Sequence, residues 1–179
     1  MNWLLDGPRE ESAGARFRRI LDSAEPTAVP GAFNAMSALI ARKAGFEALY
    51  LSGAAFSASL GLPDVGLITL DELVDQTRRI VRASGLPVLV DADTGFGGAL
   101  NVVRTVKDLE DAGAAAVQIE DQVNPKRCGH LAGKSVVPAD EFAEKVRAAA
   151  QARTDLVVVA RTDAKGVYGM DEAIRRARL

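Results

Sequence analysis

An amphipathic helix, a small residue followed by glycine, and a short apolar strand form a unit that recurs along the chain and strongly constrains its fold. Strands are expected at residues 48–51, 87–90, 115–119 and 156–160, and a weaker one near 28–30. Glycine suits the junction because the residue that ends a helix favours left-handed backbone, which costs glycine little. Strands that alternate with helices in this way predict a parallel α/β sheet.

The number of units leaves two architectures open. About five strands can be counted, and residues 170–179 are expected to form a helix. A complete (β/α)₈ TIM barrel usually needs about 250 residues, and this chain has 179. The pattern therefore fits either an open doubly wound sheet or a partial barrel with about five of the eight βα units. Residues 1–179 would form one domain, with residues 1–15 as a flexible or peripheral segment.

Two of the expected helices carry start signals. Thr69 and Glu72 have the spacing of a capping box, which predicts a helix from this point to about Ala83. Pro138 stands where the first turn of another helix would begin, a position that proline tolerates. The strands between such helices are almost continuously apolar, which is typical of a sheet covered on both faces.

Charge and cysteine content exclude several classes of protein. The formal net charge is -2 and the isoelectric point is near 5.5, so nucleic acid and membrane surfaces are not expected partners. One cysteine allows no internal disulfide, and one cysteine with one histidine supplies too few ligands for the usual zinc site. No signal peptide or membrane span is recognisable, which predicts a cytoplasmic protein.

Polar side chains follow the expected strands where each one ends. These residues are Ser52, Asp91, Asp93, Glu120, Arg161 and Asp163. In parallel α/β folds the carboxyl ends of the strands share one edge, where binding and catalytic sites form. Strands also leave the sheet into water, so one polar residue there carries little information. Carboxylates after two successive strands and an arginine after the next favour a functional site.

The Asp91-Ala92-Asp93 sequence is a candidate metal site. If the strand continues through Asp93, its period of two places both carboxylates on one face. Two negative charges so close need a cation or a proton between them. Oxygen ligands without histidine or cysteine favour a hard cation such as Mg²⁺. The alternative is a turn and helix cap, which aspartate and glycine also favour.

The loop at residues 124–130 contains the only cysteine and the only histidine, Cys128 and His130. The flanking cations Lys126 and Arg127 would favour a reactive thiolate. The alternative is a surface cysteine without a role. The nearby Gly95-Phe96-Gly97 lacks the third glycine of a dinucleotide loop and follows two carboxylates, which excludes that motif.

The loop Lys126-Arg127-Cys128-Gly129-His130 resembles one shared by lyases of the isocitrate lyase/phosphoenolpyruvate mutase superfamily. Further matching blocks are Pro30-Gly31-Ala32-Phe33-Asn34-Ala35, Tyr50-Leu51-Ser52-Gly53, Gly61-Leu62-Pro63-Asp64, Asp91 to Gly97, Ile119-Glu120-Asp121-Gln122 and Ala160-Arg161-Thr162-Asp163-Ala164. Their order and spacing resemble the 2-methylisocitrate lyase branch, over nearly the whole chain after about Arg16. The resemblance implies a TIM barrel, of which this chain would be the N-terminal portion.

The resemblance also implies a role for each matching residue. Asp91 and Asp93 would hold Mg²⁺, with Mn²⁺ as an alternative, while Asp64 and Glu120 would reach the metal mainly through water. Ser52, Gly53, Ala54, Cys128, Gly129, His130 and Arg161 would bind the substrate, and Cys128 and Arg161 would be catalytic.

The implied reaction is a retro-aldol cleavage of 2-methylisocitrate to pyruvate and succinate, with Cys128 protonating the succinate carbanion. Two other interpretations stay open. One is another superfamily enzyme, such as an oxaloacetate decarboxylase or a phosphonopyruvate-type enzyme, which would not need Cys128; the other is an inactive fragment. Full-length relatives are homo-oligomers, and self-association of this chain is expected.

Two departures from the family pattern affect the pocket. Gly53-Ala54 stands where the family usually has two glycines, and Leu131-Ala132-Gly133 follows His130 in place of Arg-Pro-Asn. The methyl group of Ala54 is expected to narrow the pocket, and the changed residues after His130 are expected to alter the closure of the loop.

Overall fold

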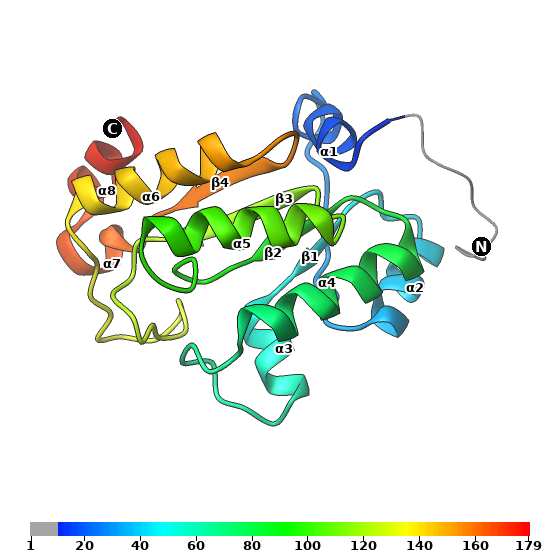
Figure 1. The fold of residues 1–179 in the computed structure, drawn as a ribbon, viewed down its shortest axis with the longest axis horizontal. Helices are drawn as coiled ribbons and strands as arrows, with labels where there is room; N and C mark the ends of the chain where they lie inside the picture. Colours follow the sequence, from blue (N-terminus) through cyan, green and yellow to red (C-terminus); the bar gives the residue numbers. More distant parts are fainter. Residues whose placement is uncertain (1–10) are drawn as a thin grey trace.

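The computed structural model describes residues 11–179 and has a four-stranded parallel sheet at its centre (Figure 1). The strands are β1 Leu49–Leu51, β2 Val88–Asp91, β3 Ala116–Glu120 and β4 Val157–Arg161. The helices are α1 Ala13–Leu21, α2 Ala35–Lys43, α3 Gly53–Ser59, α4 Leu70–Ser84, α5 Ala99–Asp111, α6 Ala139–Ala152, α7 Ala164–Tyr168 and α8 Met170–Ala177. The strand order β1-β2-β3-β4 has no reversal, unlike a doubly wound sheet, so it is that of consecutive barrel units.

The four stronger strand predictions are confirmed to within about a residue at each end, but the weaker strand near residues 28–30 is not formed. The chain there makes a single parallel bridge, between Gly31 and Tyr50. The amide of Tyr50 donates to Pro30 O at 2.9 Å, and the amide of Ala32 donates to Tyr50 O at 2.8 Å. Pro30 itself has no N–H to offer a ladder, which limits strand formation here.

The helix start signals lead to the helices that they predict. Thr69 and Glu72 form the expected capping box at the start of α4, where Thr69 N donates to the Glu72 carboxylate at 2.7 Å. Pro138 directly precedes α6, and the helix predicted at residues 170–179 is α8. Within residues 11–179, no helix combines the length and the apolar character that crossing a membrane requires.

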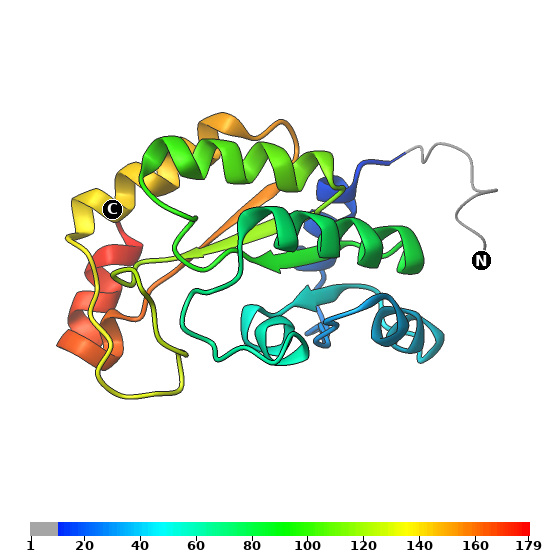
Figure 2. The ribbon, with the colours of Figure 1, turned by 60° about the horizontal axis from the view of Figure 1, so that its bottom comes forward.

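Helices α4, α5 and α6 lie side by side over one face of the sheet (Figures 1 and 2). The core between them and the strands is buried and mainly aliphatic. It includes Leu49, Leu51, Val88, Val90, Val117 and Ile119 from the sheet and Leu73, Ile80, Val102, Val106 and Leu109 from the helices. Burial of this apolar surface stabilises the fold and holds the strand ends in place.

The opposite face of the sheet is covered only in part. Phe17 of α1 packs with Ala48, Ala115 and Ala116 near the amino ends of the strands. The apolar side chains of β4 stay half-exposed, so the expectation of a sheet covered on both faces does not hold for this strand. An edge strand has a neighbour on one side only, which leaves more of it accessible.

The segment at residues 1–15 lies partly outside the described residues, which begin at residue 11. Ser12 caps α1, and Gly14 packs so closely on Asp155 that an added Cβ would overlap the Asp155 carbonyl oxygen. Arg18 of α1 forms an ion pair with the Asp155 carboxylate at 2.8 Å. Helix α1 is therefore attached to the amino end of β4.

Candidate active site

The polar residues predicted at the strand ends meet at the carboxyl edge of the sheet. Ser52 directly follows β1, Asp91 ends β2, Glu120 ends β3 and Arg161 ends β4. Glu120 and Arg161 are paired in register across β3 and β4. The parallel sheet thus gathers groups that are far apart in the sequence.

Asp91 and Asp93 come together through a turn and not through a continued strand. Strand β2 ends at Asp91, and Asp93 has a left-handed backbone with φ 49°. The prediction that strand periodicity aligns the two residues is therefore wrong. The amide of Asp93 donates to Asp91 Oδ1 at 3.3 Å. A Cβ on Gly53 would lie 3.2 Å from Asp93 Oδ1 and 3.5 Å from Asp91 Oδ2, so glycine gives both carboxylates room.

Asp91 is oriented by two donors from the neighbouring strand and helix. The hydroxyl of Tyr50 donates to Asp91 Oδ2 at 3.0 Å, and the amide of Gly53 donates to the same oxygen at 3.3 Å. Burial and the Asp91 charge raise the pKa of the Tyr50 hydroxyl, which keeps it a donor.

The group expected to bind a substrate carboxylate is partly engaged within the protein. The hydroxyl of Ser52 accepts from the amide of Ala55 at 3.3 Å and so caps α3. The amide of Gly53, one of the expected donors, points to Asp91. Ala54 lies half-buried in the first turn of α3.

Asp93 is held by a lysine from the loop after β3. Lys126 Nζ lies 2.8 Å from Asp93 Oδ1 and also forms an ion pair with Asp64. Burial and the Asp91 charge raise the pKa of Asp93 to about 6, although Lys126 opposes that shift. Asp64 thus contacts the acidic pair through Lys126.

Glu120 and Arg161 form the second half of the site. Arg161 Nη1 lies 3.1 Å from Glu120 Oε2, and its Nη2 lies 3.1 Å from Asp163 Oδ2. Burial raises the pKa of Glu120 to about 7 despite the Arg161 charge. Glu120 Oε1 is buried without a hydrogen-bond partner among the described residues. Such an orphaned carboxylate oxygen is costly unless a proton or a cation reaches it.

The loop that carries Cys128 is attached to the sheet on both sides of the thiol. At its base, Gln122 exchanges two hydrogen bonds with the backbone of Arg127, at 2.9 and 3.0 Å. Beyond the thiol, Gly129 lies against Arg161 so closely that a Cβ would overlap the guanidinium. Cys128 therefore lies between two points of contact with the site.

Cys128 and His130 are near each other within this loop. Cys128 Sγ lies 3.7 Å from His130 Nδ1, within reach of a weak hydrogen bond. Lys126, which the sequence suggested as a cation beside the thiol, is turned toward Asp64 and Asp93.

The edge fits a hard cation held by few protein ligands. Residues 11–179 contain no group of three or more His, Cys, Asp or Glu side chains placed to hold a metal ion. The buried carboxylates of Asp91 and Asp93 and the orphaned oxygen of Glu120 nevertheless supply oxygen ligands only. Mg²⁺ commonly binds through one or two carboxylates and water, which suits this edge.

Several polar contacts of the site could not be found from local sequence. Tyr50 and Gln122 stand inside blocks that carry the family resemblance, but the sequence indicated no role for either of them. Asp121 is fully buried and accepts from Thr162 Oγ1 at 2.6 Å, from the amide of Asp163 at 2.8 Å and from Arg176 at 3.0 Å. These contacts join residues more than 40 positions apart. In the sequence, Asp121 was named only as part of the Ile119-Glu120-Asp121-Gln122 block, with no role of its own.

Known proteins share this fold and up to about half of this sequence. The model of the phosphoenolpyruvate phosphomutase family matches residues 17–179. The 2-methylisocitrate lyase of Bacillus subtilis (strain 168) is 51% identical over 179 residues, which cover 99% of this chain and 59% of that enzyme.

Solved structures agree with this relationship. A crystal structure of 2,3-dimethylmalate lyase, a PEP mutase/isocitrate lyase superfamily member, matches with a TM-score of 0.89 and 42% identity, over 95% of this chain and 59% of that chain. A phosphonopyruvate hydrolase in complex with oxalate and Mg²⁺ matches with a TM-score of 0.85 and 34% identity, over 94% of this chain and 59% of that one.

The fold and the strand-end site define a partial α/β barrel with its candidate active site at the carboxyl edge of the sheet. The chain belongs to the phosphoenolpyruvate phosphomutase family, within the PEP mutase/isocitrate lyase superfamily. The predicted superfamily and the predicted partial barrel are confirmed. The chain spans 59% of the length of the Bacillus subtilis enzyme that it matches.

Proposed function

We propose that this chain carries the metal- and acid-bearing half of a divalent-cation-dependent carbon–carbon lyase that cleaves 2-methylisocitrate to pyruvate and succinate. The Bacillus subtilis relative at 51% identity bears the name 2-methylisocitrate lyase, which supports this substrate class. Mg²⁺ is the cation favoured by the oxygen ligands of the site, and Mn²⁺ is the alternative.

One observation carries the proposal. The loop around Cys128 contacts both halves of the carboxyl edge, because Lys126 reaches Asp93 and Gly129 packs on Arg161. The loop that carries the only thiol of the chain is thereby attached to the acidic pair on one side of Cys128 and to the guanidinium on the other. A retro-aldol lyase needs these groups around one substrate: ligands for a cation, a positive charge and a proton donor.

Each residue has a chemical task in this proposal. Asp91 and Asp93 would hold the cation, and the hydroxyl of Tyr50 keeps Asp91 oriented by a hydrogen bond. When bound, the cation supplies Lewis-acid stabilisation of negative charge on substrate oxygens. Asp64 and Glu120 would reach it mainly through water.

Substrate binding and proton transfer fall to the other residues. Arg161 would contact the substrate oxygens, and the backbone at Ser52, Gly53 and Ala54 would bind a carboxylate once Gly53 N is released from Asp91. Gly129 and His130 would close over the substrate from the loop. Breaking the carbon–carbon bond leaves an electron pair on the succinate carbon, which would take its proton from Cys128 Sγ.

The proposal includes self-association of the chain. The half-exposed β4 and the exposed Met36, Ile40 and Leu100 leave apolar surface accessible, and such surface favours contact with further protein. A small di- or tricarboxylate is the proposed substrate, and nucleic acid and membranes are not proposed partners.

Pyruvate release from 2-methylisocitrate tests the function. The chain is assayed alone and after fusion to the part of the Bacillus subtilis enzyme that follows its matched region. We expect little turnover by the chain alone and Mg²⁺-dependent turnover by the fusion. Cys128→Ser in the fusion should lower turnover by about 10²-fold or more while Mg²⁺ affinity is kept.

Two outcomes would contradict the proposal. A folded fusion that releases no pyruvate where the full-length relative does would exclude 2-methylisocitrate lyase activity. Turnover of oxaloacetate or phosphonopyruvate, unaffected by Cys128→Ser, would instead favour another activity of the superfamily.

A further inference from the structure

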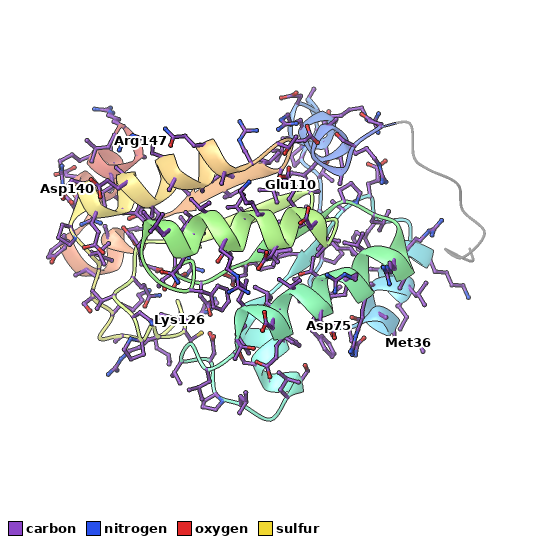
Figure 3. All side chains as sticks on the ribbon, viewed as in Figure 1. Met36, Asp75, Glu110, Lys126, Asp140 and Arg147 are labelled. Atoms are coloured by element: carbon purple, nitrogen blue, oxygen red, sulfur yellow. The ribbon has the colours of Figure 1, made fainter. Side chains whose placement is uncertain are left out.

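Lys126 lies in an unusual position for a lysine of an exposed loop. The residue is only 5% exposed, whereas Arg127 and His130 of the same loop are exposed. Figure 3 shows Lys126 on the long segment after β3, at the end of the sheet opposite to Glu110. Buried lysines are rare unless their charge is paired.

The ammonium of Lys126 is paired twice, with carboxylates from two other segments. Its Nζ forms ion pairs with Asp64, from the segment between α3 and α4, and with Asp93 Oδ1 at 2.8 Å. Gly66 packs on the same loop. A Cβ added to Gly66 would lie 3.4 Å from Asn124 Oδ1 and 3.8 Å from Lys126 Cγ. The Lys126 side chain is therefore held in place by contacts with other segments of the chain and does not lie across the surface.

We infer that Lys126 is an internal cation that competes with the divalent metal for Asp93, so that metal binding displaces this lysine from the acidic pair. The inference rests on the metal site of the proposed function. A metal ion held by Asp93 would share that buried carboxylate with the Lys126 ammonium, and the two cations would repel each other, so the binding of one would oppose the binding of the other. Lys126 is therefore a residue that sets metal affinity.

The energetic consequence follows from the shared oxygen. In the metal-free protein Lys126 offsets the repulsion between Asp91, Asp93 and Asp64, which stabilises the fold without metal. The same pairing lowers the apparent affinity for the metal, because only the fraction of molecules in which Asp93 is free can bind it. Displacement of Lys126 also releases the only buried side chain in the exposed stretch that leads to Cys128. Metal binding would therefore loosen the attachment of the loop that carries Cys128.

The exchange is tested by titrating the 179-residue chain with Mn²⁺ after bound metal has been removed with EDTA. Binding is measured by calorimetry and by electron paramagnetic resonance. We expect Lys126→Met to bind Mn²⁺ about tenfold more tightly than the unmodified chain, because no lysine has to be displaced. Lys134→Met is the matched control, since this lysine of the same loop pairs with Asp163 at 2.9 Å. Its affinity should stay within about twofold of the unmodified chain, because it shares no oxygen with the acidic pair.

The outcomes separate this inference from the proposed function. If Asp91→Asn loses Mn²⁺ binding but Lys126→Met binds Mn²⁺ no more tightly than the unmodified chain, the exchange is overturned. The proposed metal site would then still stand. Absence of binding even in Lys126→Met would overturn both.

A second measurement needs no variant. Lysine acylation read by mass spectrometry should rise about threefold or more at Lys126 when Mn²⁺ is saturating, while Lys134 is unchanged. If Mn²⁺ does not change the acylation of Lys126, the exchange is overturned.

Discussion

Glu110, at the amino end of the sheet, differs from Asp93 and Glu120, at the carboxyl end, in how its carboxylate is satisfied. At the amino end, Glu110 accepts hydrogen bonds from the amides of Thr154, Asp155 and Leu156, at 2.8, 2.6 and 2.8 Å. Burial alone would raise the pKa of Glu110, but these donors lower it below its ordinary value. At the carboxyl end, burial raises the pKa of Asp93 to about 6 and that of Glu120 to about 7.

The difference separates structural acids from functional ones. Glu110 satisfies backbone donors where β4 begins, so its charge stabilises the fold. Asp93 and Glu120 are buried with too few donors, so each remains ready for a proton or a cation. Perturbation of this kind is common at functional sites. Figure 3 labels Glu110 at the amino end of the sheet and Lys126 at the carboxyl end.

The largest expected effect comes from an acid of the carboxyl end that is fully satisfied. Asp121 pairs with Arg176 at 3.0 Å, and both side chains are buried. Asp121→Ala leaves Arg176 without that partner and should lower the free energy of unfolding by about 3–5 kcal/mol in urea titrations. Asp111→Ala, at an exposed aspartate, is the control. A loss as small as that of the control would show that Asp121 belongs with the under-satisfied acids.

Glu110→Ala should remove the satisfied acid of the amino end. Three amides then lose a charged acceptor, and the free energy of unfolding should fall by about 2 kcal/mol, reduced by partial exposure to water. Glu144→Ala replaces an exposed glutamate of α6 and should change it little. Equal stability of the two variants would contradict the structural role of Glu110.

The pH dependence of unfolding sharpens the comparison, because the contributions of Glu120 and Glu110 to the free energy of unfolding change with pH in opposite directions. Glu120 keeps its proton to higher pH in the folded protein than when unfolded, since its pKa rises from 4.5 to about 7. Its contribution is therefore fully present below about pH 4.5 and lost as pH rises through about 7. The lowered pKa of Glu110 acts in the other sense, so its contribution is lost as pH falls below its ordinary range.

Urea unfolding in EDTA at several pH values measures this dependence. Between pH 5 and 8, Glu120→Gln should remove about 1–2 kcal/mol of the pH-dependent change in the free energy of unfolding. An unchanged profile would mean that Glu120 is not a buried acid.

The smallest effect is expected at the contact between α1 and β4. A Cβ on Gly14 would overlap the Asp155 carbonyl oxygen, although alanine itself favours a helix. Gly14→Ala should therefore cost about 1 kcal/mol of unfolding free energy, as overpacking outweighs propensity. Gly31→Ala, where an added Cβ meets nothing within 4 Å, is the control. A stabilised Gly14→Ala would show that this end of the sheet is loosely packed.

Local sequence was sufficient for the four strands, for the starts of α4 and α6, for α8 and for the residues at the strand ends. The apolar runs determine β1 to β4, because their side chains bury against α4, α5 and α6. The capping box of Thr69 and Glu72 determines the start of α4 through contacts three residues apart. The segment near residues 28–30 failed as a strand because pairing depends on a partner ladder as well as on hydrophobicity.

Only the tertiary structure decided how the site residues are paired. Asp91 and Asp93 meet through a left-handed turn at Asp93, and Lys126 turns to Asp64 and Asp93 instead of to its neighbour Cys128. The partners of Lys126 lie 62 and 33 positions away along the chain, as their residue numbers show. Coulombic and hydrogen-bond partners depend on distance in space, and a sequence pattern reports only distance along the chain.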